Sequence, residues 1–451
     1  MIRVEGRASR VCDGTTRREL LRFGGLGMLG LRGAPALARA AGPRGFGRAK
    51  SLLFISLFGG PSHQDMWDLK PDAPSDVRGE FKPIETNVSG IRICEHLPKL
   101  ARMADRYVLV RSVTHPDNGH GSAMYTNFTG FPHPMPNTNP VPSVDDYPAY
   151  GSVISALRPP KVSVPPFIVV GGTQIVCGNQ IPGQRAGFLG PALEPFVVEG
   201  DPNRPDFRVP ELSLPKEIPT LRLDRRRTLL DSVERGARLA ERGAPAEALD
   251  AIRRGAFELL ASRQIREALD LSPEKPELRE RFGRDTFGQS LILARRLIEA
   301  GVPCVTVNWS RGGPWDTHGN NFAAMKDSLL PPFDRSFSTL LQDLTDRGLL
   351  DSTLVIATGE FGRTPKINKD AGRDHWAGVY TTVLAGGGIQ GGRVHGTSDA
   401  EAAYPASDPV GPADIAATLY HCMGIHPETE VYDRTNRPLK ISTGQPIGTI
   451  L

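Results

Sequence analysis

The stretch SLLFISLFGGP, residues 51–61, decides the fold of the protein. Its first eight residues form an almost unbroken apolar run, and Gly59, Gly60 and Pro61 end that run at a turn. A strand with one solvated face alternates apolar and polar side chains, whereas a strand covered on both faces is apolar throughout. The stretch therefore predicts a buried strand of an α/β sheet, with a loop starting at its carboxyl end.

Further apolar runs repeat this pattern along the 451 residues of the chain. Between several of them lies helical periodicity, in ICEHLPKLARMA (93–104), FGQSLILARRLIEAG (287–301) and MKDSLLPPFDRSFSTLLQDLTDRG (325–348). Strands that alternate with helices indicate a mostly parallel sheet covered by helices on both faces. We expect these further strands at YVLVRSVTH (107–115), PFIVVGG (166–172), VPCVTVNW (302–309), TLVIAT (353–358) and VYTTVLAGGG (379–388).

Two segments depart from this alternation. Residues 220–285 are dense in Arg, Glu, Ala and Leu at helical spacing and show no strand pattern, so they predict a helical insertion packed on the sheet domain. Residues 131–150 are rich in Pro, Asn and Asp, which predicts a long loop near whatever site the sheet builds. We therefore expect one α/β domain over residues 41–451, with the insertion inside it.

The first 40 residues carry the positive charge of the chain. The formal net charge is +4, but without the eight arginines and three acidic residues of positions 1–40 the remainder has 46 basic and 47 acidic residues. Nucleic-acid binding requires a basic face that releases counterions from phosphates. The balance of charges in the mature chain therefore argues against a nucleic-acid partner.

The segment TRRELLRFGGLGMLGLRGAPALARA, residues 16–40, resembles an export signal. Paired arginines at 17 and 18 precede a weakly apolar stretch, and the small residues Ala36, Ala38 and Ala40 end it. This order is typical of a twin-arginine signal, although Arg32 interrupts the apolar part. We expect residues 1–40 to direct the protein to the periplasm or the extracellular space. No later segment has the apolar length of a membrane span.

The cysteines do not form a metal-binding pattern. Of the five in the sequence, Cys12 lies in the predicted signal, and the other four lack C-x-x-C spacing. Buried free thiols and one or two disulfides both fit this arrangement, whereas a cysteine-built zinc site does not.

Polar residues that could bind a metal ion follow four of the predicted strands. Parallel strands bring their carboxyl ends to one edge of the sheet, where open α/β sheets bind ligands. Singly, each such residue is more often a cap or a turn residue than a ligand. Together, Asp, Glu and His form a ligand set for zinc, manganese or iron, or for calcium when fewer histidines take part. The candidates are His63 and Asp65, His120 and Ser122, Asp316 and His318, and Glu360 and His375.

Two of the polar side chains suggest catalytic roles. A serine hydroxyl is a weak nucleophile unless a base or a metal ion stabilises its alkoxide, so Ser122 beside a divalent ion would be a candidate nucleophile. Arg363 could bind an anionic oxygen through its guanidinium fork, while a surface salt bridge is an equally good explanation for it.

Several motifs resemble one family. Over nearly all of residues 50–450, the chain resembles the exported, sulfatase-like domain-of-unknown-function family that is common in planctomycete-type bacteria. More distantly, the chain resembles the alkaline phosphatase and sulfatase superfamily, which implies that fold and hydrolysis of phosphate or sulfate esters with one or two metal ions. The motifs that carry the resemblance are GGPSHQDMWDLKPD (59–72), RGEFKPIETNVSGIRICEHLPKLARMADRY (78–107), WDTHGNNF (315–322), GEFGRTPKIN (359–368), GRDHWAG (372–378) and PADIAATLYHCMGI (412–425).

The superfamily resemblance implies a metal site. Its ligand positions fall on Asp316 and His318, on Glu360 after the strand TLVIAT, and on His375, with Asp374 or a backbone carbonyl expected to orient a ligand histidine. The chain also departs from the superfamily. Phe361 replaces a ligand histidine, so we expect one metal ion rather than two. The first-strand aspartate of the superfamily would align near Gly59 and Gly60, where this chain has none, so His63 or Asp65 would have to substitute for it from the loop.

Two residues are candidates for the nucleophile, His120 and Ser122. HGSAMYTNFTG, residues 120–130, resembles the nucleophile helix of the sulfatases, with His120 at the position of the modified cysteine and Ser122 close to the phosphatase register. In this arrangement we expect Arg363 to lie at the rim of the site and to face the anion.

We interpret the chain as an exported metal-dependent hydrolase of phosphate or sulfate esters. Its substrates would be small molecules or polysaccharides, and zinc is the first choice of divalent ion, with manganese, iron and calcium as alternatives. A non-catalytic protein that keeps one metal for stability and binds a glycan or protein partner is the second interpretation. In a third, every polar strand end is only a cap. An enzyme needs an activated attacking group and stabilisation of charge, whereas a binding protein needs neither.

Overall fold

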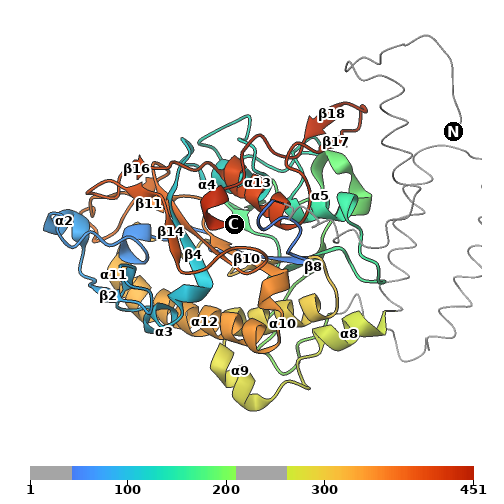
Figure 1. Cartoon of the computed structure of the whole chain (residues 1–451), viewed down its shortest axis with the longest axis horizontal. Helices are drawn as coiled ribbons and strands as arrows, with labels where there is room; N and C mark the ends of the chain where they lie inside the picture. The colour runs from blue at the N-terminus through green and yellow to red at the C-terminus, as the bar shows by residue number, and fades with distance from the viewer. Residues whose placement is uncertain (1–42, 210–261) are drawn as a thin grey trace, which may run out of the picture. The chain divides into compact units, whose positions relative to one another are not determined.

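The computed structural model describes residues 43–209 and 262–451 (Figure 1). The predicted export signal at 1–40 and most of the predicted insertion at 220–285 lie outside these residues. The described residues from Gly45 on belong to one compact unit. Among the described helices, none combines the length and the apolar character needed to cross a membrane.

An eight-stranded sheet forms the centre of this unit. Its strand order is β14-β4-β13-β10-β1-β9-β5-β8, and every neighbouring pair is parallel except the two pairs that include β13. The mostly parallel sheet predicted from the sequence is therefore confirmed. The strands are β1 (Ser51–Ser56), β4 (Tyr107–Val113), β5 (Phe167–Val170), β8 (Phe196–Val198), β9 (Cys304–Asn308), β10 (Thr353–Thr358), β13 (Tyr380–Ala385) and β14 (Arg393–His395).

The central strand β1 shows why its sequence is apolar throughout. Leu53 and Ile55 belong to the hydrophobic core on one face of the sheet, and Leu52 and Phe54 to the core on the other. Successive side chains of a strand point to opposite faces, so a strand with helices on both sides needs apolar residues at every position.

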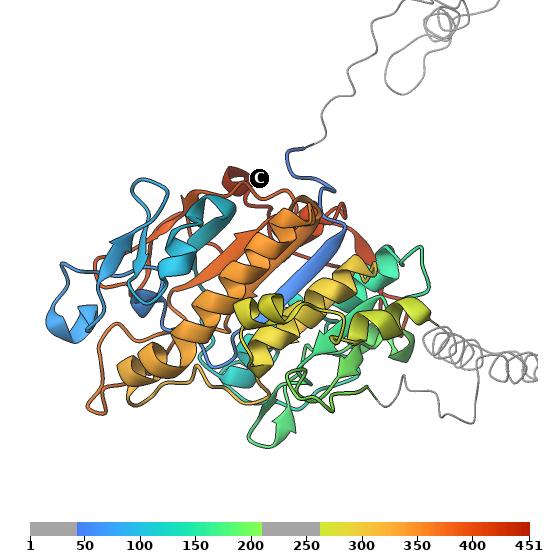
Figure 2. The same ribbon diagram turned by 90° about the horizontal axis from the view of Figure 1, so that it is seen from below.

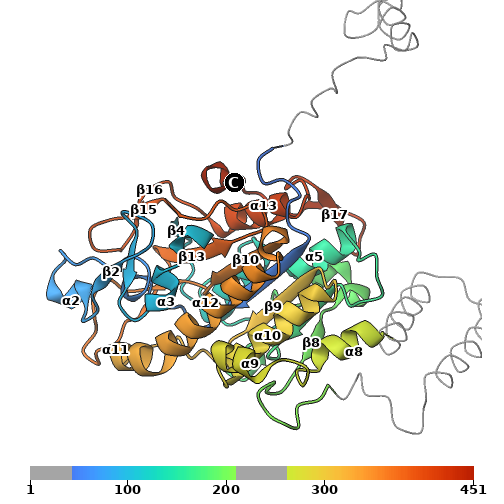
Figure 3. The same cartoon turned by 60° about the horizontal axis from the view of Figure 1, so that its bottom comes forward.

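Helices cover both faces of the sheet. On one face α10 (Thr286–Glu299) and α12 (Leu330–Asp346) lie side by side across the strands, with β1 (blue) visible beside them in Figure 2. Figure 3 shows α5 (Tyr150–Leu157) and α13 (Pro412–Cys422) on the other side of the strands. The remaining helices are α2 (Ser75–Arg78), α3 (Pro98–Ala101), α4 (His120–Thr129), α8 (Arg263–Leu269), α9 (Pro276–Phe282) and α11 (Asn321–Ala324).

Short hairpins decorate the sheet, and one of them replaces part of a predicted helix. Residues 93–104 were expected to be helical, but Arg92–Cys94 form the strand β3 and only Pro98–Ala101 are helical, because Pro98 favours a helix start and disfavours helix before it. The hairpins pair β2 (Pro83–Glu85) with β3, β6 (Ile175–Val176) with β7 (Asn179–Gln180), β11 (Gly362–Arg363) with β12 (His375–Trp376), β15 (Thr397–Ser398) with β16 (Pro405–Ser407), and β17 (Glu430–Tyr432) with β18 (Pro438–Lys440).

The cysteines of the described residues are free. Three of them are buried and behave as small apolar side chains, while Cys177 is exposed. Of the two alternatives left by the sequence, free thiols are therefore the one found, at Cys94, Cys177, Cys304 and Cys422.

Candidate metal centre

The direction of the strands brings five predicted site residues to one edge of the sheet. Because β1, β9 and β10 are parallel, the loops after them start at the same edge, where Asp316 and His318 follow β9 and Glu360 follows β10. Strand β13 runs in the opposite direction and therefore begins at this edge, so His375, which precedes it in β12, lies there too. His120 opens α4, the helix after β4.

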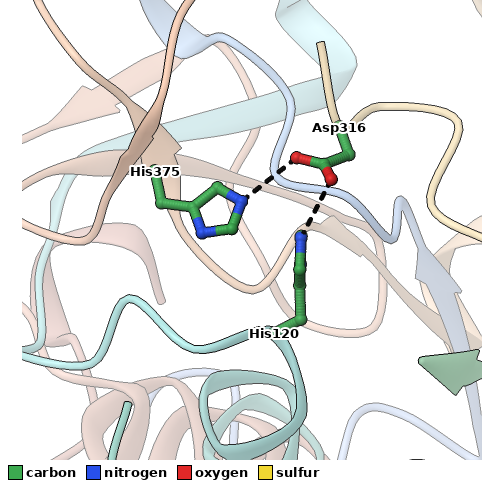
Figure 4. A group of neighbouring side chains, drawn as sticks. All are labelled: His120, Asp316 and His375. Atoms are coloured by element: carbon green, nitrogen blue, oxygen red, sulfur yellow. Dashed lines mark hydrogen bonds and ion pairs between the residues drawn. The ribbon is translucent and has the colours of Figure 1, made fainter. Parts of the chain in front are cut away.

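Three side chains converge in a compact group. His120, Asp316 and His375 each offer a ligand atom, and these atoms lie within 4.8 Å of one another. Figure 4 shows the two imidazoles pointing at the carboxylate of Asp316 from different sides. His120 Nε2 lies 3.2 Å from Asp316 Oδ2, and His375 Nε2 lies 3.1 Å from Asp316 Oδ1. Among the described residues this is the one group of three or more such side chains that could hold a metal ion.

His318 extends the group on its more exposed side. Its Nε2 lies 3.0 Å from Asp316 Oδ1 and 3.0 Å from His375 Nε2. The ring of His318 is 46% exposed, against 22% for His375 and 11% for His120. Asp316, His318 and His375 thus come together as the family resemblance implied, and His120, expected as a nucleophile, joins them.

The hydrogen bonds of the three imidazoles all have the same direction. Each ring uses Nδ1 to donate to an oxygen outside the group: His120 to Glu360 at 2.6 Å, His318 to Asp374 at 2.7 Å and His375 to the carbonyl of Asn118 at 2.9 Å. A neutral imidazole has one N–H, so its Nε2 is then a lone pair. The lone pairs of three Nε2 atoms would then face the negative oxygens of Asp316. These atoms repel one another unless protons or a cation lie between them.

The donor atoms fit a divalent cation. Nitrogen and oxygen ligands bind zinc at 2.0–2.2 Å, so two ligands of a tetrahedral ion lie about 3.3 Å apart. The distances of 3.0–3.2 Å between Asp316 and the imidazoles are close to this separation. Carboxylates and carbonyls that hold Nδ1–H are also the usual partners of histidines that bind a metal through the other nitrogen. The residues present therefore suit a zinc-like ion.

Glu360 supports the group by accepting a hydrogen bond from His120. Its carboxylate is fully buried and also accepts the backbone N–H groups of Gly59 and Gly60, at 3.0–3.2 Å. Both glycines have positive φ, and a Cβ on Gly59 would lie 2.5 Å from the backbone nitrogen of Asp316, so the close approach requires glycine. Glu360 contacts the group through His120, so it supports a ligand.

The charges of the group shift the pKa values of two members. Burial disfavours the charged form of His120, but the hydrogen bonds and negative charges of Asp316 and Glu360 prevail and raise its pKa to about 9. Burial likewise disfavours the charged form of Asp316, yet hydrogen bonds from His120 and His375 and the charge of Arg363 hold its pKa well below the usual value. Without a metal, a proton on His120 therefore supplies part of the positive charge that the group requires.

Arg363 differs from its predicted role. We expected it at the rim, facing an anion, but its side chain is fully buried and bonded on every nitrogen. One of these bonds joins Nη2 to Asp316 Oδ1 at 2.5 Å. The other acceptors are the backbone carbonyls of Gly59, Gly60, Trp315 and Arg373. Because the side chain is fully buried and each of its nitrogens bonds inside the protein, Arg363 does not reach a ligand in solvent.

Phe361 forms an apolar wall of the centre. It is 1% exposed, and its ring centroid lies 5.1 Å from that of His120 and 4.5 Å from that of His375. The position that carries a ligand histidine in the resembling superfamily is thus filled here by a ring that excludes water. This packing limits the rotation of both imidazoles and keeps the dielectric constant low.

Ser122, a predicted nucleophile, makes its contacts inside the protein. Its hydroxyl is fully buried in α4 and has two acceptors for its single proton, Asp117 Oδ1 at 2.9 Å and the Thr138 carbonyl at 3.0 Å, and it accepts from the Thr138 amide at 3.2 Å. A hydroxyl engaged in this way is not free to attack a substrate. It attaches the loop at 131–149 to the start of α4, so the expected nearness of that loop to the site is observed.

His63 and Asp65 serve other contacts than the metal ligation we expected. Both carboxylate oxygens of Asp65 accept from the guanidinium of Arg373, at 2.7 and 2.9 Å, and both side chains are fully buried. His63 is buried, lies with Nε2 3.2 Å from the Ala402 carbonyl, and has its pKa lowered to about 4, chiefly by burial. Asp65 is not available to a metal ion because both of its carboxylate oxygens bind the guanidinium of Arg373, which comes from the loop at 359–376.

Two residues escaped the sequence analysis. Asn118 orients His375 through its backbone carbonyl, and its side chain accepts the amide of Ala377. Arg373 fixes the base of the loop that carries His375. A backbone carbonyl leaves no mark in a sequence, and Arg373 looks like any loop arginine, so neither had a signal that could have been found.

Solved structures similar to this chain are distant. The lipoteichoic acid synthase LtaP from Listeria monocytogenes has 10% identity and a TM-score of 0.36, over 89% of this chain and 77% of that one. The PsFucS1 sulfatase from Pseudoalteromonas sp. has 12% identity and a TM-score of 0.36, over 84% and 68%. The alkaline phosphatase of the Antarctic bacterium TAB5 has 12% identity and a TM-score of 0.34, over 78% and 95%.

The sequence itself matches a protein family. No curated protein is similar enough in sequence to be matched. The model of the family described as "Protein of unknown function (DUF1501)" matches residues 49–451, which include the whole sheet and every member of the metal group. This chain therefore belongs to the DUF1501 family.

Proposed function

We propose that the protein is an exported, metal-dependent hydrolase of phosphate or sulfate esters. The observation that carries the proposal is the common direction of three imidazoles, each of which keeps Nδ1–H for an outer oxygen and turns Nε2 toward Asp316. If the polar residues served only as caps of the strand ends, their imidazoles would not need a common orientation toward one carboxylate. The proposed ion is divalent, with zinc as the first choice because two or three nitrogens and one carboxylate suit it.

The residues of the centre have two proposed roles, binding the ion and orienting its ligands. His120, Asp316 and His375 would hold the ion, and Glu360 and Asn118 would keep the two imidazoles in the required tautomer. A bound divalent ion would polarise an ester oxygen and make a nearby water a stronger nucleophile.

The exposed side of the centre is where a substrate would enter. His318 has the most exposed ring of the three imidazoles, so an ester would approach past it. With Asp374 holding its Nδ1–H, His318 could give a proton to, or take one from, the ester oxygen through Nε2.

Water is the proposed attacking group. The hydroxyl of Ser122 is buried and bonded, and His120 is held between the carboxylates of Asp316 and Glu360. A direct attack by water also forms no covalent intermediate with the protein, so no protein nucleophile has to be regenerated. The proposed substrates are small esters or esters carried by polysaccharides.

The proposed place of action is outside the cytoplasm. The paired arginines and small residues of positions 16–40 support export by the twin-arginine route to the periplasm or beyond. Recovery of mature protein beginning near Ala41 from a periplasmic fraction would support this part, and recovery of a chain that still begins at Met1 would contradict it.

A non-catalytic protein is the second candidate. The observation in its favour is the burial of Ser122, since a protein that keeps the metal only for stability and binds a glycan or a protein needs no nucleophile. The two candidates differ in turnover and agree in metal content.

Metal analysis joined to an ester screen tests both candidates. Purified mature protein, analysed by plasma mass spectrometry, should contain a divalent ion that is lost in Asp316→Asn and His375→Ala. His426→Ala, which changes a histidine in the loop after α13, is the matched control and should keep it. Hydrolysis of aryl phosphates or aryl sulfates by wild type and His426→Ala, but not by Asp316→Asn or His375→Ala, supports the enzyme. Metal without turnover supports the binding protein, and absence of metal from wild type contradicts both.

A further inference from the structure

The guanidinium of Arg363 is a buried cation in contact with the carboxylate of the metal group. Its Nη2 bonds to Asp316 Oδ1, the oxygen that also faces His318 and His375, while Asp316 Oδ2 faces His120. The side chain is fully buried, so water does not screen its charge. Arginine keeps its charge in proteins, which makes this cation permanent.

The backbone contacts of Arg363 fix its position. It donates to carbonyls in three segments: Gly59 and Gly60 after β1, Trp315 before Asp316, and Arg373 before His375. These segments carry or support the members of the metal group. The guanidinium is therefore held in place by the same backbone that positions the ligands, and its movement would disturb several loops together.

The balance of charge at the centre leaves room for one divalent ion. Two carboxylates contact the group from inside the protein, Asp316 and Glu360, and Arg363 cancels one of their charges. Asp374 contacts His318 from a position that is more than half exposed, where water screens it. One divalent ion already exceeds the remaining negative charge, and a second would bring like charges together in a buried site.

We propose that Arg363 is a built-in second cation that limits the centre to a single divalent ion and holds Asp316 in place for it. The inference rests on the proposed function, because it takes the metal centre as given. It explains two departures of the chain together: Phe361 offers no ligand, and Arg363 bonds to Oδ1 of the Asp316 carboxylate, which two ions would have to share.

Counting Mn²⁺ ions in the full chain tests the inference. Metal-free wild type titrated with Mn²⁺ should bind one ion per chain, and the electron paramagnetic resonance spectrum should be that of an isolated ion even with excess Mn²⁺. Two ions per chain with an exchange-coupled spectrum would overturn the inference and leave the proposed function intact. No Mn²⁺ or Zn²⁺ binding at all would overturn both.

Two variants ask whether the charge of Arg363 is responsible. Arg363→Gln removes the charge and should admit a second, weaker Mn²⁺, whereas Arg363→Lys keeps the charge and should stay at one ion. The control is Arg373→Gln, which alters an equally buried arginine of the same loop that bonds to Asp65, and it should also stay at one ion.

The remaining outcomes are decisive as well. One ion of unchanged affinity in Arg363→Gln, or a second ion in Arg373→Gln, would mean that charge at this position does not set the count, and either would overturn the inference. Should Arg363→Gln not fold, the wild-type count and Arg363→Lys still decide, since two ions in either contradicts the inference.

Discussion

Replacing Glu360 by glutamine would remove one charge from the metal centre while keeping the size of the side chain. The carboxylate is fully buried and accepts from His120 Nδ1 and from the amides of Gly59 and Gly60. Glutamine has one acceptor oxygen instead of two, so its NH₂ group would face either the N–H of His120 or the backbone N–H groups of Gly59 and Gly60. We expect Glu360→Gln to lower both the pKa of His120 and the stability of the metal-free protein.

The structure gives the size of this effect. The rise of the His120 pKa from 6.5 to about 9, achieved against burial by Asp316 and Glu360, corresponds to about 3 kcal/mol. Two carboxylates share it, so losing one should lower the pKa by roughly one unit, or about 1.5 kcal/mol. A buried amide left without its acceptor adds about 1–3 kcal/mol. The expected loss in the free energy of unfolding is therefore about 2.5–4.5 kcal/mol.

The two parts of the loss depend differently on pH. A group whose pKa is raised by folding stabilises the protein fully below its unfolded pKa, here 6.5, and that contribution is lost as the pH rises through about 9. The charge part of the Glu360→Gln loss should therefore be present near pH 6 and nearly absent near pH 10. The part due to the unsatisfied amide should remain at both.

Urea unfolding of metal-free protein near pH 6 and near pH 10 measures both parts, and histidine NMR titration, assigned with His120→Gln, measures the pKa. Glu401→Gln, a change at an exposed glutamate, is the control and should alter neither. Losses of equal size at both pH values, or a His120 pKa that does not move, would refute the electrostatic reasoning.

Three other experiments separate supporting contacts from chemistry. Ser122→Ala should cost about 1–2 kcal/mol of stability through the lost bond to Asp117 and keep ester turnover; a folded variant without turnover would reinstate the serine as nucleophile. Asp65→Asn should cost about 3–5 kcal/mol by leaving Arg373 without its partner, as seen in urea unfolding, and keep the metal content of the folded chain; an unchanged midpoint would contradict the role of this pair. Zn²⁺ binding near pH 7.5 should release about one proton from His120, because its pKa is about 9 without metal; calorimetry in buffers of different ionisation enthalpy measures the release, and its absence would show that His120 is not a ligand.

The sequence by itself determined the strands and the edge at which the chemistry gathers. Apolar runs such as residues 51–58 could be read because a strand covered on both faces needs apolar side chains at every position. Asp316 and His318 could be expected at the edge where parallel strands end, whereas the resemblance to the superfamily implied that His375, which precedes the antiparallel strand β13, joins them. The sequence predicted that these side chains converge, and the structure gave the distances of about 3 Å between them.

Only the tertiary structure decided what each polar side chain contacts. Ser122, Asp65 and Arg363 look in the sequence like a nucleophile, a ligand and an anion binder, yet each is buried and satisfied by partners elsewhere in the chain. Asp65 and Arg373 are separated by 308 positions, and no local pattern can pair them. Secondary structure follows from short-range periodicity, whereas the fate of a buried charge depends on which opposite charge folding brings within hydrogen-bond distance, and that is a property of the whole packed chain.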